Sequence, residues 1–259
     1  VHYIIIIFMF LAGSNFVLSY FAFTGKIQRV FRDNEFLTFV KFIFVFSVIV
    51  FSVLVTQIDL NTDYFYHPQV YGKVESSLRH SIFQVLAIVT TTGFVTADYT
   101  SWNSFLTVFF FGLMFLGGSA GSTSGGIKVV RHLLMFKSGF LEFKKALHPN
   151  AIIQPRFNDK VVSQEIIGNI LAFFILYMLS FIIGSLVFGL MGLDFVSAIG
   201  VAASSLGNVG PALGDYGPSG NFSQLPSAGK IWSSFLMLIG RLELFTVLIL
   251  LTPSFWSKN

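Results

Sequence analysis

The sequence predicts an all-α integral membrane protein built from repeated units of a helix, a short helix, a polar strand and a second helix. Charged residues make up 11% of the 259 residues, whereas soluble proteins have roughly 25%. Hydrophobic residues make up 54%, Phe alone occurs 33 times, and the mean hydropathy is +0.77. A water-soluble protein of this size needs more polar surface than 16 basic and 12 acidic residues supply. The lack of Cys excludes a disulfide-stabilised scaffold.

Four stretches approach or exceed the roughly 20 apolar residues that a spanning helix needs. They are Val1–Phe23, Phe36–Val55, Ile166–Leu193 and Ile231–Pro253. We predict one continuous crossing from each of them.

A further apolar segment, Phe105–Gly118, is only 14 residues long. It runs into a stretch rich in Gly and Ser, and a second helical stretch, Ile127–Phe140, follows. We therefore predict a fifth span that is broken in the middle. Ser81–Val89 and Phe195–Ser204 are too short to cross a bilayer, and re-entrant helices are the natural interpretation of both.

The positive charges predict the orientation. Three Lys or Arg residues lie on one side of the predicted spans, Arg241 lies inside the last span, and the remaining twelve lie on the other side. The three are Lys73, Arg79 and Lys230, and the twelve are Lys26, Arg29, Arg32, Lys41, Lys128, Arg131, Lys137, Lys144, Lys145, Arg156, Lys160 and Lys258. By the positive-inside rule the C-terminus is cytoplasmic and Val1 is outside, with five crossings between them. The basic pI of about 9.3 is thus a topology signal and does not indicate nucleic-acid binding.

Internal repeats organise the chain. Met9–Ser14 aligns with Met114–Ser119 and with Met237–Leu242. Each of these segments belongs to a helix that runs from outside to inside, and basic or polar residues follow it. This repetition predicts related units within one chain.

A second repeat follows the two short apolar segments. Thr91–Thr96 aligns with Ser205–Gly210, which pairs Gly93 with Gly207. Extended backbone at membrane depth cannot face lipid, but it can line a water-filled path where its carbonyls replace the hydration shell of a cation. Short helices that end there aim the negative ends of their dipoles at the ion, and Gly permits the φ angles that turn successive carbonyls to one side. Helix, pore helix, filter and helix are the units of a potassium-channel-like pore.

Four motifs resemble the membrane (TrkH-like) subunit of Trk-type potassium uptake systems, in the Trk/Ktr/HKT superfamily. They are Thr90–Phe94, Gly117–Lys128, Ser205–Pro211 and Gly240–Glu243. In that family four covalently linked pore units surround one permeation path. The resemblance implies the C-terminal half of such a subunit, with two of its four filter segments. The opening at Val1 inside a hydrophobic helix, without Met, leads us to expect an upstream part.

The resemblance also divides the chain. Residues 1–35 would hold the last helix of an upstream pore unit and a cytoplasmic loop. Residues 36–160 would form pore unit three, with its broken inner helix and a basic cytoplasmic loop. Residues 161–259 would form pore unit four.

By resemblance, backbone carbonyls of two filter segments bind potassium. These residues are Thr91, Thr92, Gly93, Phe94, Ser205, Leu206, Gly207 and Asn208. Only Gly93 and Gly207 are required by the chemistry alone. The alternative is a pair of extracellular turns, because Thr-Gly and Gly-Asn are common in turns. Their repetition after two re-entrant segments favours the filter.

The resemblance makes the Gly-rich run an intramembrane loop beneath the filter that acts as a flexible gate. Its residues are Gly117, Gly118, Ser119, Ala120, Gly121, Ser122, Thr123, Ser124, Gly125 and Gly126. Their low helix propensity suits a segment that moves. A helix kink packed by small residues is the structural alternative. The Gly-x-Ser-x-Gly pattern also leaves open an intramembrane serine hydrolase that uses Ser119, although an apolar helix precedes it where that motif needs a strand.

Arg241 is the second candidate gate residue. A charge in mid-span costs roughly 3 kcal/mol on insertion scales and indicates a function by default. Its alignment with Gly13 and Gly118 puts it beside the narrowest part of the pore, where a fixed positive charge lowers cation dwell and discourages leakage. The alternative is a structural ion pair, for which Glu243 is a poor partner because residues two apart do not share a helical face.

The sequence therefore predicts potassium uptake across the cell membrane and no enzyme activity. K⁺ is the expected transported ion, and no covalently bound cofactor is expected. A sodium-permeable or Na⁺/K⁺ co-transporting relative remains the alternative. We expect a multi-pass protein of the cell (inner) membrane, surrounded by lipid. The resemblance implies a homodimer and a cytoplasmic nucleotide-binding regulatory subunit that would contact the basic loop Lys128–Lys160.

Overall fold

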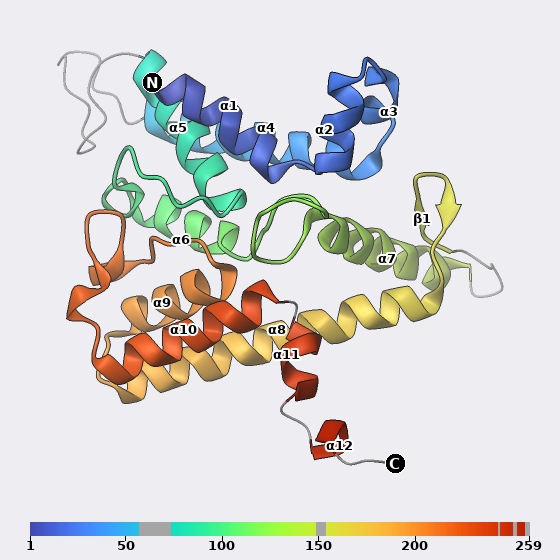
Figure 1. The fold of residues 1–259 in the computed structure, drawn as a ribbon. Helices are drawn as coiled ribbons and strands as arrows, with labels where there is room; N and C mark the ends of the chain where they lie inside the picture. Colours follow the sequence, from blue (N-terminus) through green and yellow to red (C-terminus); the bar gives the residue numbers. More distant parts are fainter. Residues whose placement is uncertain (57–73, 149–153, 243, 251–252, 257–259) are drawn as a thin grey trace.

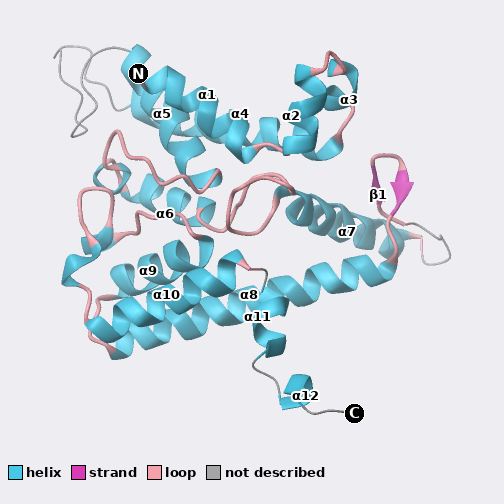
Figure 2. Cartoon of the chain, in the orientation of Figure 1, coloured by secondary structure: helices cyan, strands magenta, loops and turns pink. Residues whose placement is uncertain are grey.

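Figure 1 shows the computed structural model of the chain, which describes residues 1–56, 74–148, 154–242, 244–250 and 253–256. In these ranges the chain is mainly helical, and its strands are confined to one two-stranded hairpin. Figure 2 shows two groups of helices with loops gathered between them. The predicted all-α class is confirmed.

The first group contains the N-terminal helices. α1 (His2–Gly13) packs on α5 (Val74–Val89), which packs on α4 (Asn34–Thr56). α2 (Phe16–Phe23) and α3 (Ile27–Phe31) connect α1 to α4. α5 is buried along most of its length, so it reaches into the middle of the molecule.

The second group contains the C-terminal helices. α9 (Phe195–Gly207) packs on both α8 (Gln164–Leu190) and α10 (Ser227–Arg241), and it is almost entirely buried. α11 (Leu244–Leu250) packs on α8, and α12 (Pro253–Trp256) follows it. Each group therefore places one short helix, α5 or α9, inside its own hydrophobic core.

Two further helices lie between the groups (Figure 1). α6 (Ser104–Leu113) packs on α5, and α7 (Val129–Leu147) contacts both α4 and α8. β1 (Arg156–Phe157) and β2 (Lys160–Val161) pair antiparallel between α7 and α8. Three short 3₁₀ helices complete the described chain: η1 (Tyr99–Ser101), η2 (Gly214–Tyr216) and η3 (Phe222–Gln224).

Side-chain caps set where several helices begin. Asn15 caps α2, Asn103 caps α6 and Asp194 caps α9, and each side-chain oxygen accepts a backbone N–H of the first turn. These caps fix the start of each short helix independently of hydropathy.

Two helices of the described chain, α4 and α8, are long and apolar enough to cross a membrane. The bent pair of α1 and α2 makes a third if it is counted as one span. Large apolar side chains are exposed on α4 and α8, among them Phe44 at 67% and Leu186 at 64%, as expected of surfaces that meet lipid. The five crossings and their orientation stay predictions.

The prediction of one continuous helix over Val1–Phe23 is wrong. α1 and α2 meet at 114°, because Ser14 is extended (ψ 161) and Asn15 starts a new helix. The amide of Phe16 donates to the carbonyl of Gly121 at 3.3 Å, so that the Gly-rich loop contacts the bend. Hydropathy misses the bend because both helices are apolar.

The prediction of one helix over Ile231–Pro253 is also wrong. α10 ends at Arg241, and α11 begins at Leu244. The break follows Gly240, where a Cβ would lie 1.8 Å from the carbonyl oxygen of Leu206. The backbones of α9 and α10 therefore touch immediately before the helix stops.

Other elements agree with expectation. The break predicted after Phe105–Gly118 is the loop between α6 and α7, and the two short apolar segments are the helices α5 and α9. α5 begins at Val74, seven residues before the apolar segment that predicted it. Hydropathy missed its first turns because they carry polar residues.

Candidate functional site

The first candidate filter segment leaves the buried end of α5. Thr91 has a left-handed backbone (φ 54), as does Gly93 (φ 69). The amides of Thr92 and Gly93 both donate to the carbonyl of Ala87, at 3.0 and 3.1 Å, so they point back to the helix. In the described part of the chain the carbonyl oxygens of residues 91–94 accept no hydrogen bond. Unused carbonyls after a buried helix are what a cation site of backbone oxygens requires.

The second segment leaves α9 with the same hydrogen-bond pattern. Asn208 is left-handed (φ 56), and the amide of Val209 donates to the carbonyl of Ser204 at 3.0 Å. This matches the bond from Thr92 to Ala87 in the first segment. Gly210, with φ 110, is then the counterpart of Gly93.

The predicted polar strand requires an extended backbone at Ser205, Leu206 and Gly207. These three residues instead form the last turn of α9. The carbonyl of Ser205 accepts the Asn208 amide at 3.2 Å, and that of Leu206 accepts the Asn208 side chain at 3.5 Å. Among the described residues, the carbonyls of Gly207, Asn208 and Val209 accept no hydrogen bond. A left-handed Asn at a helix C-terminus is a recognised stop signal, and it marks the end of α9.

The two segments touch each other. A Cβ on Gly93 would lie 2.3 Å from the carbonyl oxygen of Val209, and one on Gly210 would lie 3.7 Å from the Cα of Gly93. Farther along, the hydroxyl of Tyr99 donates to the carbonyl of Ala212 at 3.2 Å. The unused carbonyls that follow α5 and those at the end of α9 therefore lie close together.

The loop of residues 117–126 contacts both candidate filter segments. The amide of Gly125 donates to the hydroxyl of Thr91 at 2.7 Å. A Cβ on Gly125 would lie 2.4 Å from the carbonyl oxygen of Gly207, so only Gly fits there. The amide of Ser119 donates to the carbonyl of Gly13 at 2.9 Å, which joins the loop to the end of α1.

The loop is closed at its base. The amide of Gly117 donates to the carbonyl of Ile127 at 2.8 Å, and the amide of Val129 donates to that of Gly118 at 3.1 Å. Inside the loop the hydroxyl of Ser124 accepts from the Gly118 amide at 2.8 Å. Ends that lie close together are typical of a compact Ω-loop. The interruption is thus an excursion between two helices, larger than a simple kink.

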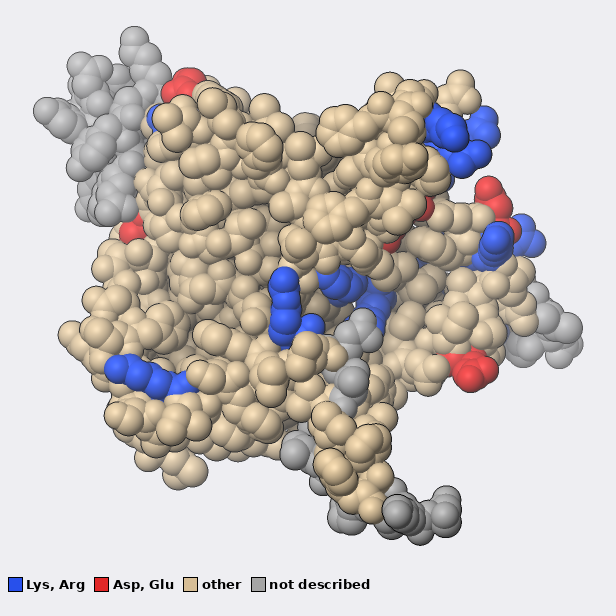
Figure 3. Space-filling model, in the orientation of Figure 1, with Lys and Arg blue, Asp and Glu red and all other residues tan. Residues whose placement is uncertain are grey.

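Basic side chains surround a cavity of about 280 Å³ that the loop lines. Lys128, Arg131 and Arg241 line it together with Phe173, and the guanidinium of Arg131 lies 3.8 Å from the centre of the Phe173 ring. Figure 3 shows basic side chains gathered around a hollow in the middle of this face. Arg241 is exposed at the end of α10. Glu243, its candidate ion-pair partner, lies outside the described residues.

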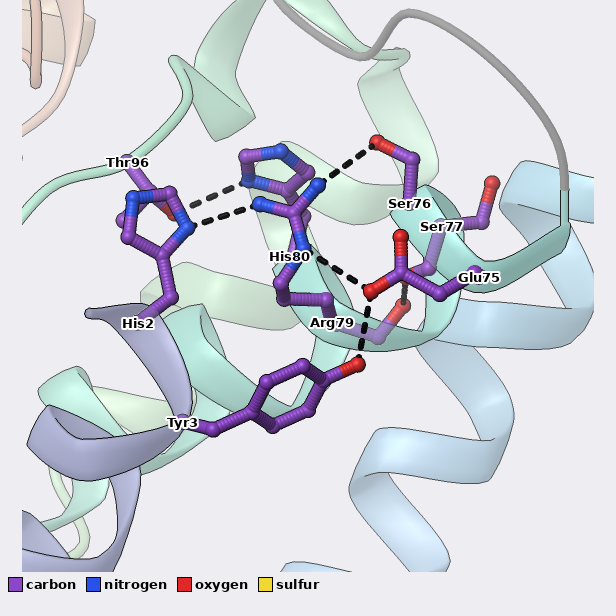
Figure 4. Close-up of polar contacts among 9 residues, drawn as sticks. His2, Tyr3, Glu75, Ser76, Ser77, Arg79, His80 and Thr96 are labelled. Carbon is purple, nitrogen blue, oxygen red and sulfur yellow. Dashed lines mark hydrogen bonds and ion pairs between the residues drawn. The ribbon is translucent and has the colours of Figure 1, made fainter.

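A polar cluster joins α1 and α5 (Figure 4). Glu75 accepts hydrogen bonds from the Tyr3 hydroxyl at 2.7 Å and from Arg79 at 3.1 Å. The bond from Tyr3 holds the pKa of the exposed Glu75 carboxyl below its usual value. His80 follows Arg79 in α5, and its ring nitrogen Nδ1 lies 2.9 Å from the hydroxyl of Thr96. This cluster fastens the start of α5 and the chain that follows the first filter segment.

Ser119, the candidate nucleophile, is 1% exposed. Among the described residues its hydroxyl has no hydrogen-bond partner, so none of them is placed as a base to activate it. The geometry needed for a serine hydrolase is therefore missing from the described residues.

Sequence reasoning missed Val209, Gly210 and Glu35. Gly210 could have been found from Asn208, two residues before it, because Asn often ends a helix in a left-handed conformation. Glu35 is buried beside the loop, and its oxygen Oε1 accepts the Ala120 amide at 2.6 Å. No local sequence pattern predicts this contact, because Glu35 and Ala120 lie far apart in the sequence.

The chain resembles known proteins over nearly its whole length. The family model TrkH, described as cation transport protein, matches residues 1–258. A Trk system potassium uptake protein TrkH from Escherichia coli K12 is 36% identical over 256 residues, which is 98% of this chain and 50% of that protein. A Trk system potassium uptake protein TrkI from Halomonas elongata is 40% identical over 184 residues, covering 71% of this chain and 37% of that protein.

A solved structure has the same fold. The crystal structure of the potassium transporter TrkH from Vibrio parahaemolyticus aligns with a TM-score of 0.88 and 32% identity, over 99% of this chain and 53% of that one. The chain thus spans about half the length of the curated relatives it matches.

Proposed function

Because the chain belongs to the TrkH family of cation transport proteins, we propose that the protein takes up potassium across the cell membrane through a path lined by these two filter segments. The observation that carries the proposal is the paired end of α5 and α9. Each helix is followed by a left-handed residue, Thr91 or Asn208. Carbonyls beside that residue accept no hydrogen bond among the described residues, and the two segments touch at Gly93 and Val209. The similar proteins are named as potassium uptake proteins, which supports the choice of ion.

The ligands in this proposal are backbone oxygens. The first segment supplies the carbonyls of residues 91–94, as the sequence predicts. In the second segment the ligands move along the chain to the carbonyls of residues 207–209. Oxygen ligands suit a hard cation, and the C-terminal ends of α5 and α9 add the negative ends of two helix dipoles.

The loop of residues 117–126 is the proposed gate. It contacts both filter segments and the end of α1, and its residues 121–126 line the same cavity as Arg241. A cation that leaves the filter would meet the loop and then a positive charge. Displacement of the loop opens the path, and Arg241 limits leakage through it.

Assembly and placement complete the proposal. The protein would be a multi-pass protein of the inner membrane with a cytoplasmic C-terminus, and its pore units would divide at residues 35 and 160. It would pair as a homodimer. A cytoplasmic nucleotide-binding regulatory subunit would contact the basic segment between residues 128 and 160.

Ion flux tests this function directly. The full-length protein that carries this chain is reconstituted in liposomes, and uptake of radioactive Rb⁺ is measured against competing K⁺ or Na⁺. We expect K⁺ to suppress the Rb⁺ signal and Na⁺ to leave it nearly unchanged, and Gly93→Ser to abolish the difference. Equal competition by Na⁺ would favour the sodium-permeable alternative. Unchanged selectivity in Gly93→Ser would refute the filter.

A further inference from the structure

Glu35 is a buried acid that the transport path does not use. It lies in the first turn of α4 and is 5% exposed. Its oxygen Oε1 accepts the amide of Ala120, in the middle of the 117–126 loop, at 2.6 Å. A buried carboxylate is costly unless it is hydrogen-bonded, so this contact is a strong, charge-assisted one.

The helix that carries Glu35 also packs on α7, the helix that follows the loop. At that end of the loop, the amide of Val129 donates to the carbonyl of Gly118 at 3.1 Å. Glu35 thus holds the middle of the loop at Ala120, while the start of α7 holds its base.

The hairpin between α7 and α8 fixes the helix that carries Glu35. Asn158, in the hairpin turn, accepts the amide of Asn34 at 2.8 Å and donates to the carboxylate of Asp33 at 2.8 Å. The other oxygen of Asp33 accepts the amide of Phe36 at 2.9 Å. Asn158 and Asp159 are both left-handed, which is the geometry of a tight two-residue hairpin turn. The hairpin tip therefore lies beside the residues that flank Glu35.

We propose that Glu35 is a positioning residue that keeps the 117–126 loop closed, and that the hairpin tip at Asn158 sets its position. The proposal rests on the function proposed above, in which this loop is the gate. To open, the loop must break the Glu35–Ala120 bond. A contact that moves the hairpin would shift the start of α4 and weaken that bond, which links the cytoplasmic hairpin to the filter.

Labelling of the loop tests this link without relying on transport. Ala120→Cys places a thiol on the loop and leaves the backbone amide intact, and the chain has no other Cys. The full-length protein, with any Cys outside this chain removed, is labelled with a membrane-impermeant thiol reagent, and its melting temperature is measured in parallel. Glu142→Gln is the control, because Glu142 is an exposed acid of α7 that pairs only with Lys145 among the described residues.

We expect Glu35→Ala to raise the labelling rate about tenfold, the range expected for loss of a hydrogen bond to a charged group. Asn158→Ala should raise it less, and Glu142→Gln should leave it unchanged. If Glu35→Ala fails to fold, Glu35→Leu takes its place, because Leu fills the buried space but has no atom that accepts the Ala120 amide. An unchanged labelling rate in a folded Glu35 variant overturns the inference.

Rb⁺ flux through the same variants separates the two proposals. Faster labelling with higher unstimulated flux supports both of them. Faster labelling with wild-type flux leaves Glu35 as the anchor of the loop but overturns the loop as the gate, and with it the gating part of the proposed function. Faster labelling in Glu35 variants with no change in Asn158→Ala overturns the role of the hairpin.

Discussion

Replacement of filter glycines by Ala gives a graded test of the site. Gly93 has φ 69, and a left-handed backbone costs a residue with a Cβ roughly 1–2 kcal/mol. Its Cβ would also lie 2.3 Å from the Val209 carbonyl oxygen, closer than any real contact, so the two segments must separate. Overpacking of this kind costs about 1–3 kcal/mol. Together these effects give Gly93→Ala a cost of roughly 2–5 kcal/mol.

Gly210→Ala has only the backbone cost. At φ 110 a side chain is strained by roughly 1–3 kcal/mol, but the nearest atom to an added Cβ, the Cα of Gly93, lies at an ordinary 3.7 Å. Gly207→Ala differs in kind, because Gly207 is helical and its Cβ would lie 2.7 Å from the Met114 carbonyl oxygen, outside the filter. Gly189→Ala is the control, since an added Cβ there meets nothing within 4 Å.

The assay is Rb⁺ flux with K⁺ or Na⁺ competition in liposomes, together with thermal unfolding. Each 1.4 kcal/mol changes a population about tenfold, so we expect Gly93→Ala to lose at least about tenfold in K⁺ selectivity and Gly210→Ala to lose less. Gly207→Ala should lower the melting temperature more than it changes selectivity. Gly189→Ala should leave selectivity unchanged and should not lower the melting temperature. Wild-type selectivity in Gly93→Ala would refute the filter. A larger selectivity loss in Gly207→Ala than in Gly210→Ala would favour the sequence-based alignment, which pairs Gly93 with Gly207, over the alignment by hydrogen bonds, which pairs Gly93 with Gly210.

Three further substitutions test neighbouring parts of the site. Arg241→Ala should raise flux through the open path while Arg241→Lys keeps it low, and single-channel or liposome flux that is the same in both would exclude a role for the charge. His80→Ala should lower stability by about 1 kcal/mol through loss of its bond to Thr96, measured by thermal unfolding; an additive loss in the double variant with Thr96→Val would show that the bond contributes nothing. Ser119→Ala should transport normally, and the unchanged protein should resist a serine-directed probe, whereas labelling at Ser119 would revive the hydrolase.

The break between α6 and α7 could be predicted because composition and length agree. An apolar segment too short to cross leads into a run rich in Gly and Ser, and neither residue type favours a continued helix. The break between α1 and α2 could not be predicted in this way. Ser14 and Asn15 are two polar residues in an otherwise apolar stretch, and the loop that contacts their bend comes from residue 121.

The register of the second filter segment shows a different limit. Aligned by residue type, Thr91-Thr92-Gly93 matches Ser205-Leu206-Gly207. The backbone aligns by hydrogen bonds instead, and Asn208 takes the left-handed position that Thr91 takes in the first segment. A filter is built from carbonyl directions, which depend on φ and ψ and not on side-chain identity. Sequence repeats therefore locate such a segment to within a few residues but do not fix its register.

Arg241 occupies the position in its repeat that Gly13 and Gly118 occupy in the other two, and the packing of the three segments explains this difference. α1 ends at Gly13, where a Cβ would lie 2.4 Å from Thr90 beside the first filter segment, and Gly118 has the carbonyl oxygen of Gly13 at 2.5 Å from its own Cβ position. The Thr90 side chain fills the first position and the Gly13 carbonyl fills the second, so no side chain fits at either. α10 makes its close contact one residue earlier, at Gly240, which leaves the next position open. Arg241 can therefore line the same cavity as the loop, and its substitution should alter ion flow without disturbing the packing of the helices.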